Sequence, residues 1–118
     1  MSLRVETWRA AWESRDVERI VALYAPDATH ASALVPRFLP AAGGTVCRGR
    51  EQIADYFRRA LARFRELRFE LVTVTEDAAR SAVEYRRHSD VDGTNPAHVL
   101  ELLEWQDGLL CAVRVFHF

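Results

Sequence analysis

Residues 97–117 read AHVLELLEWQDGLLCAVRVFH, and this stretch decides the fold class. Apolar and polar side chains alternate with period two over residues 97–105 and again over residues 109–117, which predicts two β-strands. Asp107-Gly108 between them suits a two-residue turn whose backbone needs positive φ. The stretch is therefore expected to form an antiparallel hairpin.

The residues ahead of this hairpin carry two more strands of the same kind. Residues 67–75 and 80–89 follow a period of two and are rich in β-forming side chains. Short connections separate the successive strands, which favours antiparallel neighbours. The C-terminal half is therefore expected to form a meander of long strands.

The N-terminal half is helical in pattern. Apolar side chains recur at steps of three and four over residues 4–14 and, most clearly, over residues 50–64. Asp16 is a good N-cap for a shorter helix between them. The apolar stripe expected on that shorter helix consists of Val17, Ile20, Val21 and Tyr24.

Two segments between the helices are less regular. Residues 29–35 are expected to form a strand, and residues 36–44, with two Pro and two Gly, are expected to form a loop. Residues 34–44 are also apolar. Two interpretations remain open: the segment covers a cavity as a lid, or it packs against the body or a partner subunit.

Helices in the first half and antiparallel strands in the second half indicate an α+β fold. The length of 118 residues fits one domain. Three amphipathic helices would cover one face of the sheet. A strongly curved sheet around a long helix leaves an internal pocket, which is a common place for a small ligand to bind.

The composition excludes several classes of protein. All 16 basic residues are arginine, so the chain has no Schiff-base lysine, pyridoxal-phosphate anchor or P-loop lysine. No cofactor is expected. The net charge of −1 argues against nucleic-acid binding, which usually needs a basic excess.

Cysteine usage and hydropathy indicate the compartment. Cys47 and Cys111 are too isolated for a cysteine-based zinc site, and both are expected to be buried thiols. The sequence shows no signal peptide and no apolar run long enough to cross a bilayer. We therefore expect a cytoplasmic protein without a membrane partner.

Several short motifs, in their order and spacing, resemble the SnoaL-like polyketide cyclase group of the nuclear transport factor 2-like, or ketosteroid isomerase-like, superfamily. They are WRAAWESRD at 8–16, LYAPDAT at 23–29, GREQI at 49–53, VEYR at 83–86 and WQDGLL at 105–110. The resemblance covers nearly the whole chain, as a single SnoaL-like domain over residues 1–118. It implies a cone-shaped half-barrel with three N-terminal helices, an apolar pocket and a homodimer formed through the outer sheet face.

Members of the superfamily include polyketide cyclases, ketosteroid isomerases, epoxide hydrolases, dehydratases and non-catalytic binding modules. Carried over residue by residue, the isomerase's helix tyrosine falls on Trp8, its aspartate base on Ser32 and its oxyanion-binding aspartate on Glu101. The late acid of the cyclases falls on Phe118. Glu101 is therefore the one acid retained at these positions.

Glu101 is the strongest catalytic candidate, because an acid flanked by apolar residues on one strand face has a raised pKa and can act as acid or base. The alternative is a structural partner for an arginine or a histidine. The assisting candidates are His30 and His117, which the resemblance turns toward the pocket. Their alternatives are a bond to the backbone or a half-exposed position at a strand end.

The predicted pocket wall combines aromatic residues with the inward strand positions that the resemblance implies. It consists of Trp8, Trp12, Tyr24, Ser32, Phe57, Val99, Leu103, Trp105, Cys111, Val113 and Val115. Arg87 has two interpretations, an anchor for an anionic ligand or a solvated side chain. No metal site is expected, because the histidines lack the spacing of metal ligands.

Two classes of function remain open. The first is a small enzyme in which Glu101, assisted by His30 or His117, performs acid/base chemistry on a small apolar, ring-containing metabolite. Its reaction would be that of an isomerase, cyclase or hydrolase. The second is a non-catalytic ligand-binding or dimerisation module of the same fold.

Overall fold

The computed structural model describes residues 2–91, 93 and 95–118. These residues form α-helices α1 (Leu3–Ser14), α2 (Val17–Val21), α3 (Val35–Phe38) and α4 (Gly49–Leu61), together with the 3₁₀ helix η1 (Pro40–Ala42). The strands are β1 (Tyr24–Ser32), β2 (Val46–Arg48), β3 (Leu67–Glu76), β4 (Arg80–Ser89), β5 (Ala97–Gln106) and β6 (Leu109–His117).

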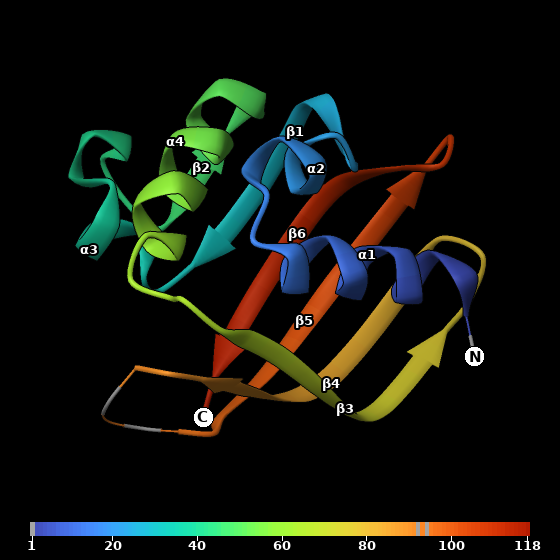
Figure 1. The fold of residues 1–118 in the computed structure, drawn as a ribbon. Coiled ribbons are helices and arrows are strands. Elements are labelled where there is room, and N and C mark those ends of the chain that lie inside the picture. Colours follow the sequence, from blue (N-terminus) through green and yellow to red (C-terminus); the bar gives the residue numbers. More distant parts are fainter. Residues whose placement is uncertain (1, 92, 94) are drawn as a thin grey trace.

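The six strands form one sheet in the order β2-β1-β6-β5-β4-β3. Strands β1 and β6 run parallel, and every other neighbouring pair runs antiparallel. Figure 1 shows a curved sheet with α1, α2 and α4 on the same side of it. The sheet does not close, since β2 and β3 are its two edges. The predicted α+β fold with a curved, mainly antiparallel sheet is confirmed.

The predicted meander is confirmed almost to the residue. Strands β4 and β6 have the predicted bounds, and β3 and β5 each extend one residue further. The period of two places Val83 and Tyr85 of β4 in the interior beside Val99 and Glu101 of β5. These inward positions form the concave floor under the helices.

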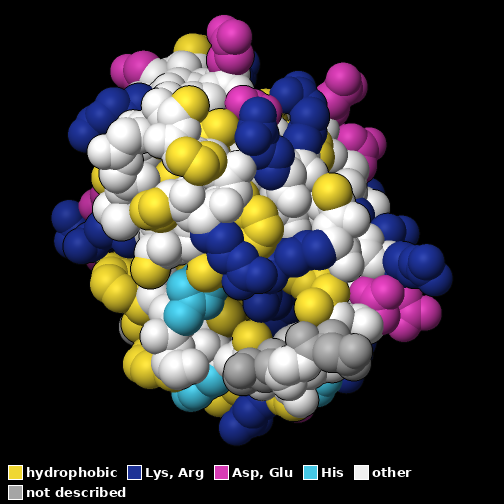
Figure 2. Space-filling model, turned by 90° about the vertical axis from the view of Figure 1, so that its left-hand side faces the viewer, with side chains coloured by type: hydrophobic (Ala, Val, Ile, Leu, Met, Phe, Trp, Pro, Cys, Tyr) yellow, Lys and Arg dark blue, Asp and Glu magenta, His cyan; other side chains and the backbone are white. Residues whose placement is uncertain are grey.

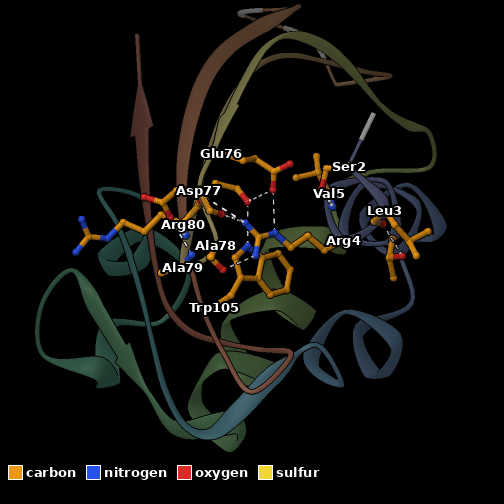
Figure 3. Close-up of polar contacts among 12 residues, drawn as sticks. Ser2, Leu3, Arg4, Val5, Glu76, Asp77, Ala78, Ala79, Arg80 and Trp105 are labelled. Carbon is orange, nitrogen blue, oxygen red and sulfur yellow. Dashed lines mark hydrogen bonds and ion pairs between the residues drawn. The ribbon is translucent and has the colours of Figure 1, made fainter.

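Helix α1 is fixed to the far end of the meander by Arg4. Ser2 caps the helix by accepting a hydrogen bond from the Val5 N–H at 3.3 Å. The Arg4 guanidinium bonds Glu76 at 2.8 Å, donates to backbone carbonyls of the β3–β4 turn and lies 5.4 Å from the ring centroid of Trp105 (Figure 3). This contact holds α1 across the sheet.

The start of the first strand differs from the prediction. Tyr24 was expected on the shorter helix, but α2 ends at Val21 and Tyr24 opens β1 opposite Leu110 of β6. Pairing with β6 overrides the helical pattern. Pro26, which has no N–H, falls in the interruption between the paired residues Tyr24 and Thr29, so the strand tolerates it.

The segment after β1 is more ordered than predicted. The strand expected over residues 29–35 ends at Ser32, and the expected loop contains α3 and η1, so the described residues form one more α-helix than expected. Val35 and Leu39 are buried in the core, and Phe38 lies 6.4 Å from Tyr56 of α4 between ring centroids. The segment therefore packs against the body of the domain.

A short edge strand was missed altogether. Strand β2 pairs with β1 through three residues, and Cys47 lies opposite His30. Gly49 follows at φ +82°, a conformation that favours glycine, and starts α4 directly from this strand. Helix α4 ends at Leu61, three residues before the predicted end at Phe64.

A β-bulge changes the inward positions at the start of β6. Glu104 pairs with Ala112 and Trp105 pairs with Leu110, so Cys111 is an extra residue on β6. Leu110 and Val113 are consequently buried, while Cys111 is only half-buried and its thiol donates to the Glu104 carbonyl at 3.4 Å. The expectation that Cys111 faces the pocket as a buried thiol is therefore wrong.

Candidate functional site

A cavity lies between α4 and the concave face of the sheet. Its volume is about 60 Å³, which is room for a few water molecules and less than the roughly 300 Å³ at the lower end of ligand pockets. Its wall is formed by Trp12, His30, Ser32, Leu34, Tyr56, Phe57, Ala60, Leu61, Arg63, Phe64, Leu67, Phe69, Tyr85, Arg87, Glu101, Val115 and His117. All three catalytic candidates line this one cavity.

Glu101 is the buried acid of the cavity. Its side chain comes from the middle of β5, between Val83 of β4 and Val115 of β6, and it is 3% exposed. The hydroxyl of Tyr85 donates a hydrogen bond of 2.5 Å to Oε2. Among the described residues Oε1 has no hydrogen-bond partner although it is buried. One carboxyl oxygen is thus held in place, and the other keeps an unused acceptor.

The pKa of Glu101 is raised from 4.5 to about 7. Burial is the largest cause, because it disfavours the charged carboxylate. The hydrogen bond from Tyr85 and the nearby positive charge of Arg87 act in the opposite direction. Glu101 is therefore able to gain or lose a proton near neutral pH, which suits a general acid or base.

His30 comes from β1 and is 3% exposed. Burial, with a smaller contribution from His117, lowers the pKa of His30 from 6.5 to about 3, so the imidazole is neutral at physiological pH. Its Nδ1 lies 3.0 Å from the hydroxyl of Tyr24, and burial raises the pKa of that hydroxyl well above its ordinary value. Because Tyr24 keeps its proton, we assign it as the donor, which places the imidazole proton of His30 on Nε2.

His117 and Ser32 meet in the wall of the cavity. Ser32 of β1 lies opposite Val115, and its hydroxyl is 3.4 Å from Nε2 of His117. The Ser32 hydroxyl also accepts the Leu34 N–H at 3.1 Å, so it ends the strand as well as lining the cavity. Partial burial and the charges of Arg87 and Arg63 lower the pKa of His117, whose side chain remains exposed at the cavity mouth.

Several predicted wall residues lie elsewhere in the structure. Trp12, Ser32, Phe57 and Val115 line the cavity. Trp8 packs behind the wall, with its ring centroid 5.5 Å from Phe69 and 5.7 Å from Tyr85. The other predicted wall residues that do not reach the cavity are Tyr24, Val99, Leu103, Trp105, Cys111 and Val113.

Helix α4 and its C-terminal turn supply wall residues that the prediction missed. Tyr56, Ala60 and Arg63 follow one another at helical spacing and face the sheet together. That spacing is visible in the sequence, and it would have extended the predicted wall. The ring of Tyr85 lines the cavity as well, and its hydroxyl is a polar partner of Glu101 that the prediction also missed.

Arg87 lines the cavity, in keeping with its inward position on β4. Its Nε is buried without a hydrogen-bond partner among the described residues, and its guanidinium lies 5.3 Å from the ring centroid of Phe64. Within residues 2–91, 93 and 95–118, no group of three or more His, Cys, Asp and Glu side chains is placed to hold a metal ion. No helix in the described part of the chain has the length and apolar character to cross a membrane.

A family model described as the SnoaL-like domain matches residues 5–113. The chain belongs to the SnoaL-like domain family. This confirms the resemblance that the motifs carried. A comparison of this SnoaL-like chain with curated proteins finds no match.

Solved structures share the fold of this SnoaL-like domain. A SnoaL-like protein of unknown function from Burkholderia thailandensis aligns with a TM-score of 0.80 at 23% identity, over 97% of this chain and 91% of that one. A protein with a ketosteroid isomerase-like fold from Catenulispora acidiphila, in complex with trimethylamine, aligns with a TM-score of 0.75 at 20% identity, over 98% and 85%. TerC, co-crystallised with polyporic acid, aligns with a TM-score of 0.77 at 16% identity, over 98% and 88%.

Proposed function

We propose that this SnoaL-like domain is a cofactor-independent enzyme that transfers a proton on a small, ring-containing organic molecule, with Glu101 as the acid or base. The observation that carries the proposal is the free Oε1 of Glu101. It belongs to a carboxyl that is buried, lines the cavity and has a pKa raised to about 7. A buried carboxyl oxygen without a hydrogen bond costs stability, so its presence at this position favours a chemical role.

His30 is the proposed electrophilic partner of Glu101. Its low pKa makes it a poor base, but the Nε2–H of a neutral imidazole donates a hydrogen bond to an oxygen that becomes negative. In the proposed step, Glu101 takes a proton from a carbon next to a carbonyl. The electron pair moves onto the carbonyl oxygen, which His30 stabilises, and Glu101 returns the proton to the same carbon or to a conjugated one.

Aromatic side chains support a ring-containing ligand. Tyr56, Phe57 and Phe69 line the cavity, and the indole Nε1 of Trp12 is a further buried donor without a partner among the described residues. Small molecules bound to proteins of the same fold, trimethylamine and polyporic acid, also support small-molecule binding. Because the cavity is small, a ring fits only when the ligand also occupies the space at its mouth.

Deuterium exchange tests the proposal. Cyclohexanone is incubated in D₂O with the wild type, with Glu101→Gln and with Glu104→Gln, and deuterium at the α-carbons is followed by NMR. Glu104 is the matched control, since it lies on the same strand and pairs with Arg80 at 3.2 Å. We expect faster exchange with the wild type and the control, and exchange at the buffer rate with Glu101→Gln.

The alternative is a binding module without catalysis. It would be supported if cyclohexanone bound to the wild type and to Glu101→Gln alike while neither protein accelerated exchange. Equal acceleration by the wild type and Glu101→Gln would remove Glu101 from the mechanism. Native mass spectrometry of the freshly purified protein would also measure the mass of any ligand that remains bound.

We further propose a homodimer through the outer face of the sheet. Phe116 of β6 is 43% exposed there and lies opposite Leu100 of β5, and Leu102 follows on the same face. Apolar side chains on the outer face of a sheet favour a second copy of the chain as partner. Sedimentation equilibrium should give twice the chain mass for the wild type and a monomer for Phe116→Glu.

A further inference from the structure

An open hollow lies beside the cavity. It measures about 390 Å³ and shares Leu34, Arg63, Phe64, Arg87 and His117 with the cavity wall. Its remaining wall comes from α3, the β4–β5 connection and the end of β6, which all lie toward the left of Figure 1. The hollow and the cavity therefore adjoin each other along these shared residues.

Three arginines line this hollow: Arg37, Arg63 and Arg87. On the face shown in Figure 2, basic side chains gather near the middle with histidine side chains beside them. The three side chains share the lining of one hollow. Burial lowers the pKa of Arg63, and the positive charges of Arg87 and Arg37 lower it further. Like charges that converge on a hollow attract an anion.

None of the three arginines forms an ion pair with an acidic side chain of the described residues. Other arginines of the chain do, for example Arg80 with Glu104 and Arg59 with Asp55, both at 3.2 Å. Asp90 of the nearby β4–β5 connection accepts hydrogen bonds from the backbone N–H groups of Arg65 and Glu66 instead. The positive charge of the cluster is thus not neutralised by these side chains.

Aromatic rings hold the guanidinium groups in place. Arg63 lies 4.7 Å from the ring centroid of Phe38 and 4.5 Å from that of Phe64, and Arg87 lies 5.3 Å from that of Phe64. A guanidinium that stacks on a ring keeps N–H groups at its edge for an oxyanion. The Nε of Arg63 donates to the Ala60 carbonyl at 2.9 Å, which leaves its two terminal amino groups for that purpose. The Nε of Arg87 is buried with no partner among the described residues, which leaves a donor to satisfy.

We propose that Arg63 and Arg87, with Arg37 at the rim, bind the carboxylate of an organic acid whose apolar ring enters the cavity toward Glu101. This deepens the proposed function and rests on it for the identity of the ligand as substrate. A carboxylate accepts two parallel hydrogen bonds from one guanidinium, and the aromatic walls next to the arginines suit a ring. The arginines are binding and specificity residues, and proton transfer remains with Glu101.

Benzoate is the probe, because it joins a carboxylate to one ring, and benzamide is its uncharged match. Affinities are measured by calorimetry or NMR titration at low and high salt. Arg87→Gln and Arg63→Gln each remove one arginine of the cluster. Arg86→Gln is the control, because Arg86 precedes Arg87 on β4 and is exposed on the opposite face.

We expect benzoate to bind the wild type more tightly than benzamide, and added salt to weaken it. Each cluster variant should lose affinity for benzoate about ten-fold or more, whereas Arg86→Gln should bind like the wild type. Arg87→Lys keeps the positive charge but loses the parallel N–H donors of the guanidinium. Its affinity for benzoate should lie between that of Arg87→Gln and that of the wild type. Circular dichroism shows whether Arg87→Gln folds. If it does not fold, Arg87→Lys is the variant that tests this position.

Three results would overturn the proposal: no benzoate binding at millimolar concentration, equal binding of benzamide, or benzoate binding that Arg87→Gln and Arg63→Gln leave unchanged. Inorganic phosphate is titrated in the same way. If phosphate bound more tightly than benzoate, the ligand of the site would be a phosphate and the proposed carboxylate would be wrong. Glu101→Gln separates the two proposals. Benzoate binding that Glu101→Gln retains supports the arginine site even if deuterium exchange fails, and lost exchange supports Glu101 even if benzoate does not bind.

Discussion

The hydroxyl of Tyr85 and the carboxyl of Glu101 form a hydrogen bond of 2.5 Å in the interior of the domain. Tyr85 lies opposite Val99 on the neighbouring strand, so the bond runs diagonally between β4 and β5. It favours the ionised carboxylate, while burial favours the neutral acid more strongly. The balance between these two effects sets the proton affinity of the site.

Removal of the Tyr85 hydroxyl should raise the pKa of Glu101 above that of the wild type. Tyr85→Phe keeps the ring, which stacks on Phe69 at 4.3 Å between centroids, and deletes only the donor. A ¹³C NMR titration of the glutamate carboxyls measures the shift, and Glu101→Gln identifies the signal by its loss. A lower or unchanged pKa in Tyr85→Phe would show that the bond does not stabilise the carboxylate.

Glu101 should make the domain less stable as the pH rises from 4.5 to 7. In this range the unfolded carboxyl is ionised while the folded one keeps its proton, so the folded state binds more protons and loses stability with increasing pH. The total loss from this group is about 3 kcal/mol. Glu101→Gln should lack it, so the variant gains stability relative to the wild type across this range.

Urea unfolding at pH values spaced through this range measures the difference between the two proteins, and Glu104→Gln is the control. A constant difference between Glu101→Gln and the wild type at every pH would contradict the raised pKa of Glu101.

His30 should make the domain sensitive to acid. Its folded pKa of about 3 lies below the 6.5 of an ordinary histidine, so between these values the unfolded state binds one more proton. Stability from this group is complete above pH 6.5 and is lost as the pH falls toward 3, by about 5 kcal/mol in total. We expect ¹⁵N NMR to show a neutral imidazole with its proton on Nε2 well below pH 6.5. Protonation of His30 near pH 6.5 would refute this environment.

Arg4 should stabilise the contact between α1 and the β3–β4 turn. Arg4→Ala removes the ion pair with Glu76, the hydrogen bonds to carbonyls of the turn and the contact with Trp105. The side chain is only partly buried, so we expect a loss of about 1 kcal/mol of unfolding free energy. Arg19→Ala, at an exposed position of α2, is the matched control in urea unfolding. Equal losses in the two variants would show that the Arg4 contact contributes nothing specific.

Local patterns were sufficient to predict most of the sheet and one central feature of the site. The period of two on β5 placed Glu101 on one strand face with apolar residues, and the family resemblance identified it as a pocket acid. Helix α4 was equally visible, since its apolar stripe follows the helical period. These elements depend on neighbours that lie close along the chain.

The remaining features depend on partners distant in the sequence. Tyr24 opens a strand because β6 pairs with it, and Cys111 leaves the inward face because a bulge inserts one residue there. The size of the cavity depends on which aromatic rings reach it, and Trp8 packs behind the wall instead. Neither the partner strand, the bulge nor the final volume leaves a signal in the local pattern.

The place of β6 in the sheet has a consequence for how the domain folds. β6 is the last strand in the chain, yet it lies between β1 and β5 and is the link that joins β1 and β2 to the meander. Contacts between the first and last strands have a high loop-closure entropy and form slowly. Ser32 and His117 become neighbours only through this pairing. A ribosome-bound chain from which β6 has not yet emerged therefore cannot assemble the cavity.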